Sequence, residues 1–296
     1  MNKSTAIEAL KKYTERLVAL SEEKITAGEQ IYDTMGDMES YGEQVEGPWE
    51  EEYANVVADI EEAPDEEFFE FLKEASKAFY GALPCCIIGS LRKREAADAI
   101  IAEWLKNPIL QKDINSSTLT HEEVEATDDA SFAIFIAGKK QSEKVFEALA
   151  ETFKNCLTTN EMFLESIITA MSSEAAVPQI MALLKDDDLN FSKKADAMQM
   201  MCNTGVKNDE IYREMKRNFK LLCKDPSKEI VGAMLMFDYG DTRIVTALRK
   251  LVMDKIEAGS DNPKEDNTNI YILLSMINKL GGNTKDMTGG KNLFET

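Results

Sequence analysis

Apolar residues recur in this 296-residue chain with a period close to 33 residues, and this repeat constrains the fold more than any other feature. The reference residues Val145, Val177, Ile211 and Ile244 are separated by 32, 34 and 33 residues. In each copy, apolar residues also stand 13, 10 and 9 positions before the reference residue and 4 positions after it. These are Phe132, Phe135, Ile136 and Leu149; Leu164, Ile167, Ile168 and Met181; Met198, Met201, Cys202 and Met215; and Val231, Met234, Leu235 and Leu248. Self-similarity at a fixed period indicates a repeat architecture.

The spacing inside each copy indicates a pair of helices. The three earlier positions fall on one face of an α-helix, and so do the reference residue and the residue four after it. A short turn-forming segment separates the two sets, as at Thr204-Gly205 and Tyr239-Gly240-Asp241. One helix pair cannot bury its apolar face alone, so neighbouring pairs are expected to stack. The sequence therefore predicts an all-α fold, an α-solenoid of stacked helix pairs.

Helical patterns also cover the N-terminal part of the chain. Thr5 and Glu8 have the spacing of a capping box. Pro48 precedes a second helical pattern, and Asp65 opens a third. The predicted division is an N-terminal helical cap or bundle over residues 1–124, a repeat array over 125–281 and a flexible tail over 282–296.

Charge is distributed unevenly along the chain. The net charge is −20, from 34 basic and 54 acidic residues, and residues 25–72 hold sixteen acids and no Lys or Arg. Residues 193–255 instead carry 13 bases and 9 acids. The acidic segment is interpreted either as a solvated surface that aids solubility or as a site for a basic partner. Direct binding of nucleic acid is disfavoured, because a phosphate backbone is repelled by such a net charge.

Residues 172–188, SSEAAVPQIMALLKDDD, and 240–254, GDTRIVTALRKLVMD, resemble HEAT-like repeats of the bilin-lyase type. Each has a small polar turn, a helix that opens with Val or Ile, leucines, and an Asp near its end. The resemblance extends over about residues 131–258, where the other two copies match in periodicity only. It implies a binding scaffold, since most HEAT-like proteins are scaffolds. A minority are enzymes, but no catalytic motif of theirs is found in this chain.

A search for catalytic or metal-binding groups finds little. His121 is the only histidine, and it lies in an expected capping box of Thr120 and Glu123. With one histidine and no cysteine pair at ligand spacing, a zinc site is not expected. Asp186-Asp187-Asp188 lacks the spacing of a calcium loop and is interpreted as a solvated turn. No phosphate-binding glycine loop occurs either. We therefore predict no catalytic, cofactor-binding or metal-binding residues.

Five cysteines, an odd number without a CxxC pattern, suggest a reduced, cytoplasmic compartment. Cys85 and Cys86 are either core residues or reactive thiols whose pKa is lowered by the neighbouring Arg92-Lys93-Arg94. The longest uncharged apolar stretch, 78–91, has 14 residues, fewer than the roughly 20 that cross a bilayer. Charges among the N-terminal apolar residues argue against a signal peptide.

The predicted function is that of a non-enzymatic, cytoplasmic scaffold or adaptor for protein–protein interaction, without cofactor or membrane contact. In HEAT-like solenoids the second helix of each pair lines the concave face. By that resemblance the partner-binding residues are Arg213, Lys216, Lys220 and Arg249. The alternative is an enzyme or small-ligand-binding helical protein with a pocket between the N-terminal helices and the array. Trp49, Trp104, Cys85 and Cys86 lie in segments that would line it.

Overall fold

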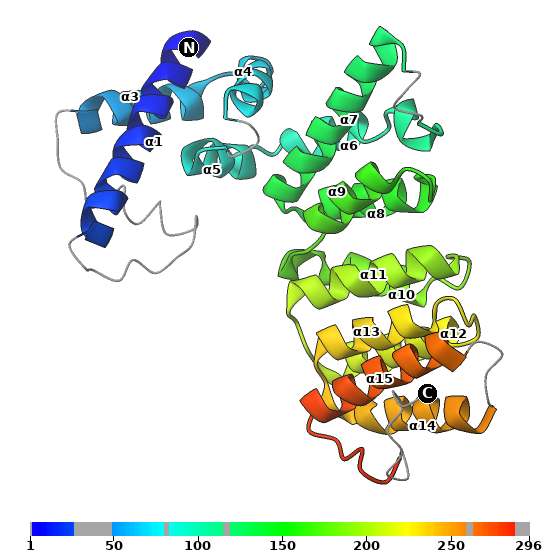
Figure 1. Ribbon diagram of the computed structural model, residues 1–296. Coiled ribbons are helices and arrows are strands. Elements are labelled where there is room, and N and C mark those ends of the chain that lie inside the picture. Colours follow the sequence, from blue (N-terminus) through cyan, green and yellow to red (C-terminus); the bar gives the residue numbers. More distant parts are fainter. Residues whose placement is uncertain (1, 27–48, 80–82, 115–118, 259–262, 288–296) are drawn as a thin grey trace. The chain divides into compact units, whose positions relative to one another are not determined.

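A computed structural model describes residues 2–26, 49–79, 83–114, 119–258 and 263–287. All regular secondary structure in these ranges is helical, which confirms the predicted all-α class (Figure 1). The chain divides into two compact units. The first comprises Met1–Asn107 and Val124–Val145, and the second Pro108–Glu123 and Phe146–Thr296. The division predicted from the sequence instead has boundaries after residues 124 and 281.

The first unit is built from helices of 8 to 24 residues around an aromatic and aliphatic core. Its helices are α1 (Lys3–Thr26), α3 (Trp49–Glu62), α4 (Asp65–Ala78), α5 (Cys85–Lys93), α6 (Ala97–Trp104) and most of α7 (His121–Lys140). Helix α1 packs on α3 and α4, and α3 packs on α5. The helix starts expected after Pro48 and at Asp65 are confirmed. The capping box of Thr5 and Glu8 is wrong, because Asn2 Oδ1 accepts the Thr5 N–H at 3.2 Å.

The second unit is a series of helices that pack on their neighbours in the sequence. Its elements are η1 (Pro108–Gln111), α8 (Glu143–Asn155), α9 (Glu161–Ala170), η2 (Glu174–Ala176), α10 (Val177–Lys185), α11 (Phe191–Thr204), α12 (Asp209–Leu222), α13 (Glu229–Tyr239), η3 (Thr242–Ile244), α14 (Val245–Ala258) and α15 (Pro263–Lys279). Helix α11 contacts α9, α10, α12 and α13. Helix α13 contacts α15 in turn, and α10 contacts α12, so several helices also meet the next but one (Figure 1).

Glycine and asparagine make the tight turns between these helices. Gly205 ends α11 and Gly240 ends α13, with φ values of +70° and +69°, a left-handed conformation that favours glycine. The Asn208 side chain then caps α12 by accepting the N–H groups of Glu210 and Ile211, each at 2.9 Å. The predicted turns at Thr204-Gly205 and at Tyr239-Gly240-Asp241 are therefore confirmed.

The predicted repeat positions are buried or half-buried in the first three copies, and the prediction is wrong in part for the fourth. In α13, Val231 and Met234 are 40% and 48% exposed, although their positions in the repeat are apolar. The reason is Gly232, where a Cβ atom would lie 3.2 Å from Leu222 Cβ of α12. The side of α13 that carries Gly232 can approach α12 closely, so this side faces inward. Val231 and Met234 therefore face outward.

Residues 282–287, which we name the C-terminal strap, pack against the last two helices. The Gly282 N–H donates to the Ile277 carbonyl at 2.8 Å, and a Cβ atom at position 282 would lie 2.7 Å from Val245 Cγ1. Met287 is only 4% exposed. This packing differs from the flexible tail that the sequence suggests from residue 282; residues 288–296 lie outside the described residues.

Candidate interaction surface

Helix α12 combines a buried apolar face with a charged outer face. Ile211, Met215 and Phe219 are at most 3% exposed. They follow one another at intervals of four residues and therefore lie on one side of the helix. Asp209 and Glu210 occupy the first turn, where negative charge interacts favourably with the helix dipole. The sequence pattern thus fixes which side of α12 is presented to solvent.

Three of the predicted partner-binding residues, Arg213, Lys216 and Lys220, share this outer side of α12, and we call them the basic face. Arg213 and Lys220 are exposed, and Lys216 is half-buried with its Nζ 5.7 Å from the centre of the Tyr212 ring. The Arg213 Nε donates to the Asp209 carbonyl at 3.1 Å. Arg213 and Lys220 are seven residues apart, which is about 10 Å along the helix, and Lys216 lies between them. The three charges therefore form a short row.

The fourth predicted residue, Arg249 of α14, is held by the C-terminal strap. Its Nη2 lies 2.7 Å from Asp286 Oδ2, and its Nη1 donates to the Asn283 carbonyl. The hydrogen bond to the carboxylate raises the pKa of Arg249 and lowers that of Asp286. Arg249 is therefore engaged within the chain, a contact that its position in the repeat does not reveal.

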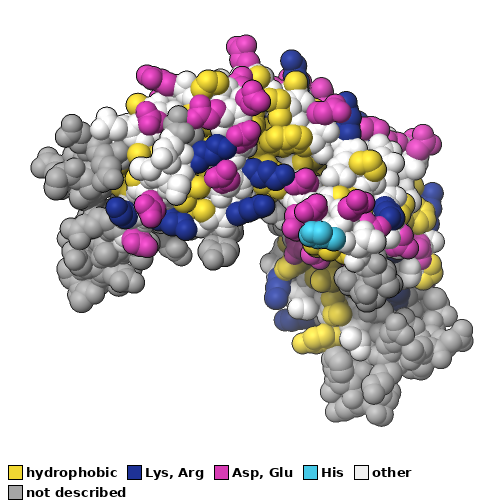
Figure 2. All heavy atoms as spheres, turned by 90° about the horizontal axis from the view of Figure 1, so that it is seen from above, with side chains coloured by type: hydrophobic (Ala, Val, Ile, Leu, Met, Phe, Trp, Pro, Cys, Tyr) yellow, Lys and Arg dark blue, Asp and Glu magenta, His cyan; other side chains and the backbone are white. Residues whose placement is uncertain are grey.

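Other bases of residues 193–255 are also paired within the fold. Arg217 of α12 binds Glu214 at 3.3 Å and also Asp187. Arg243 lies 3.9 Å above the Tyr212 ring and binds Asp241 at 2.6 Å. Basic and acidic side chains are also interspersed elsewhere, on the face of the molecule that Figure 2 shows. Four of the thirteen bases of residues 193–255, Arg217, Arg243, Arg249 and Lys255, thus form ion pairs with described acids of the chain. The three residues of the basic face form no ion pair with the described residues.

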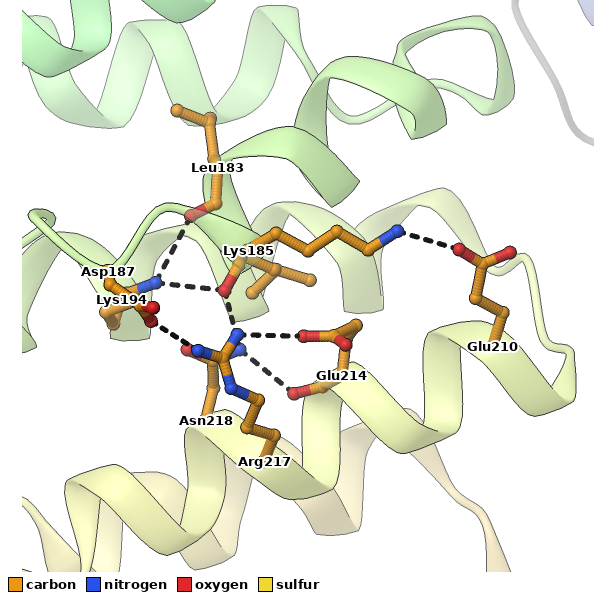
Figure 3. Close-up of polar contacts among 9 residues, drawn as sticks. Leu183, Lys185, Asp187, Lys194, Glu210, Glu214, Arg217 and Asn218 are labelled. Atoms are coloured by element: carbon orange, nitrogen blue, oxygen red, sulfur yellow. Dashed lines mark hydrogen bonds and ion pairs between the residues drawn. The ribbon is translucent and has the colours of Figure 1, made fainter.

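Beneath α12 lies a buried polar network that the sequence analysis missed (Figure 3). Lys194 of α11 is 1% exposed, and its Nζ donates to the carbonyls of Leu183 and Leu184 at 3.4 and 2.9 Å. Asn218 of α12 is fully buried and donates to the same Leu184 carbonyl at 3.0 Å. These carbonyls lie in the last turn of α10, where no further turn of the helix supplies donors. The Asp186 N–H, just after the helix, also donates to the Leu183 carbonyl at 3.3 Å. The two side chains therefore cap α10 and join three helices.

Basic side chains cap further helix ends in the same way. In the first unit the Lys140 Nζ donates to the carbonyls of Arg92 and Arg94 at 2.9 and 2.8 Å, at the end of α5. The Arg94 Nη2 donates to the Ile60 carbonyl at 2.9 Å, at the end of α3. A cation at a helix C-terminus also interacts favourably with the helix dipole. Many bases of this chain therefore stabilise the fold and are not available to a partner.

A sequence signal for these caps exists. Lys194 stands four and seven residues before the buried Met198 and Met201, so it lies on their stripe. Asn218 lies seven residues after Ile211 and three after Met215, again on the apolar stripe. A polar residue inside such a stripe must find a hydrogen-bond partner when it is buried. The pattern could therefore have predicted both residues as structural.

The alternative of a reactive thiol is not supported at Cys86. Burial raises its pKa to about 11, which outweighs the lowering by a hydrogen bond from Tyr53. The thiol is thus held in its protonated form, the opposite of an activated cysteine. Trp104, which is also expected from the sequence to line the alternative pocket, packs within the first unit. Its ring centre lies 5.5 Å from that of Phe69 and 5.6 Å from that of Phe132. The side chain of Trp49 lies outside the described residues.

We expect Cys86 to react with iodoacetamide at pH 8 about 100-fold more slowly in the folded protein than in denaturant, because only the thiolate reacts. The measurement is the alkylation rate of the peptide by mass spectrometry, in a Cys85→Ser background that leaves one thiol in the segment. Equal rates in the folded and denatured protein would contradict the raised pKa.

The acidic turn after α10 is held by basic side chains. Asp186 binds Lys154 at 2.7 Å, and Asp187 binds Arg217. His121 is exposed, and Thr120 and Glu123 exchange the two hydrogen bonds of the predicted capping box, at 2.9 and 3.3 Å. Within the described ranges, no three His, Cys, Asp or Glu side chains are placed to hold a metal ion.

No single helix of the described residues is long and apolar enough to cross a membrane. The segments Glu161–Ala170 and Glu174–Lys185 reach the required apolar length only together, and they are bent by 103°. No protein-family model, curated protein or solved structure matches the chain. The basic face must therefore be interpreted from its own geometry.

Proposed function

We propose that the chain is a non-enzymatic protein-interaction scaffold, a HEAT-like α-solenoid whose partner binds the basic face and Arg249. The observation that carries the proposal is the row of three cations on the outer side of α12, opposite its buried face. Packing of α12 does not require these charges, since Ile211 and Met215 supply its core contacts. Their alignment therefore supports a role in recognition.

Electrostatics then governs how a partner would associate. The chain as a whole carries a net charge of −20, so a local row of cations is a distinct feature for an oppositely charged surface. Complementary charge increases association rates and fixes orientation, and salt screens it over about 8–10 Å. Exposed ion pairs contribute only about 0–1 kcal/mol each, so the four residues are expected to act as a set.

The variant Arg213→Ser/Lys216→Ser/Lys220→Ser/Arg249→Ser tests this proposal. We expect its affinity for a protein that co-purifies stoichiometrically with the wild type to fall at least about tenfold at low salt, because several weak pairs are lost together. Its thermal unfolding should change little, since these side chains lie off the apolar stripe. Full retention of the partner would overturn the basic face as the binding site.

A further inference from the structure

The C-terminal strap shows what kind of group Arg249 accepts. Asp286 offers a carboxylate at 2.7 Å, and Asn283 offers a backbone carbonyl. Every peptide segment with acidic side chains carries both groups. The Asp286 side chain is 62% exposed, so this contact lies at the surface and is open to competition from solvent-borne groups. The strap is thus an internal example of the ligand chemistry that Arg249 accepts.

The extent of the basic face selects between an acidic peptide and a nucleic acid. Arg213 and Lys220 are seven residues apart, which is about 10 Å along α12. Asp209 and Glu210 precede this row on the same helix, and Glu214 lies within it. Tight binding of a nucleic acid requires many phosphate contacts over a longer basic track. The basic face offers only three cations over about 10 Å, with acids before and within the row. This length suits a short peptide segment that carries a few carboxylates.

We propose that the basic face binds an acidic peptide segment and that Asp286 of the strap competes with this segment for Arg249. This inference rests on the proposed function and adds the class of partner and its regulation. Met287, 4% exposed, and the close fit of Gly282 against Val245 anchor the strap without Asp286. Loss of the carboxylate therefore removes the ion pair at Arg249 Nη2, while Nη1 keeps the Asn283 carbonyl and the strap stays docked.

The test uses the full chain and a fluorescein-labelled ten-residue polyglutamate peptide, with fluorescence anisotropy at low salt. We expect the wild type to bind the peptide and Asp286→Asn to bind it about three- to tenfold tighter, since one competing pair is removed. Arg213→Ser/Lys216→Ser/Lys220→Ser should bind it at least about tenfold more weakly. The matched control, Lys93→Ser/Lys106→Ser/Lys144→Ser, removes the same charge from exposed positions on α5, on the turn after α6 and on α8, and should bind as the wild type does.

Each opposite result has a distinct meaning. If Asp286→Asn binds like the wild type while the triple variant of the basic face loses binding, competition by the strap is overturned. Tighter binding of a ten-nucleotide DNA strand than of polyglutamate would overturn the peptide class. If polyglutamate does not bind but the fourfold Ser variant still loses its co-purified partner, this inference fails and the proposed function stands. Retention of that partner by the fourfold variant would overturn the proposed function itself.

Discussion

Met215→Asp is expected to unfold the second unit or to destabilise it by at least about 4 kcal/mol. Met215 lies at the centre of the buried face of α12 and has no exposed surface. The substitution places a carboxylate there without a cationic partner, and burial of an unpaired charge is among the most destabilising changes known. Since domains are stable by only about 5–15 kcal/mol, most of the margin would be lost. Urea unfolding followed by circular dichroism measures the effect.

Met234→Asp is the matched control. It is the same substitution on the neighbouring α13, at a residue that is 48% exposed. We expect a change within about 0.5 kcal/mol, as for most surface positions. The pair separates the repeat register of the structure from that of the sequence, which places both methionines in the core. Equal destabilisation by the two variants would support the sequence register instead.

The helical class and most helix starts could be predicted because periodicity and turn residues act locally. The register of α13 could not, since its sequence EIVGAMLMFDY is apolar on every side and period 3.6 selects no face. Packing decides instead, through the close contact of Gly232 with Leu222. A uniformly apolar helix thus requires knowledge of its neighbours before its buried face is known.

The part of the candidate surface that lies on one helix could be predicted from the sequence. Arg213, Lys216 and Lys220 follow from the stripe of α12 alone, because residues off the buried face are presented to solvent. The state of Arg249 depends on Asn283 and Asp286, more than 30 residues later in a segment without periodicity. Contacts of this kind are set by tertiary packing, and no local pattern encodes them.

Lys194→Met is expected to cost about 1–3 kcal/mol at neutral pH. The substitution keeps a long apolar side chain but removes the donor to the Leu183 and Leu184 carbonyls. Asn218 still donates to Leu184 and the Asp186 N–H to Leu183, so each carbonyl keeps one donor. The cost is therefore that of two lost hydrogen bonds, at about 0.5–1.5 kcal/mol each. The free energy of unfolding, measured in urea for both proteins, gives the cost. A variant as stable as the wild type would show that burial of the ammonium cancels its hydrogen bonds.

The pH dependence of this cost separates the two contributions. Burial lowers the pKa of Lys194 below its usual value of about 10.4. Between the folded and unfolded pKa values the unfolded chain binds more protons, so the contribution of Lys194 to stability rises with pH through that window. The neutral amine retains its donors, whereas Met has none, so the cost of Lys194→Met should increase as the pH rises toward the unfolded value of about 10.4. A cost that decreases instead would mean that the helix-end carbonyls stabilise the ammonium more than burial destabilises it, and that the pKa is raised.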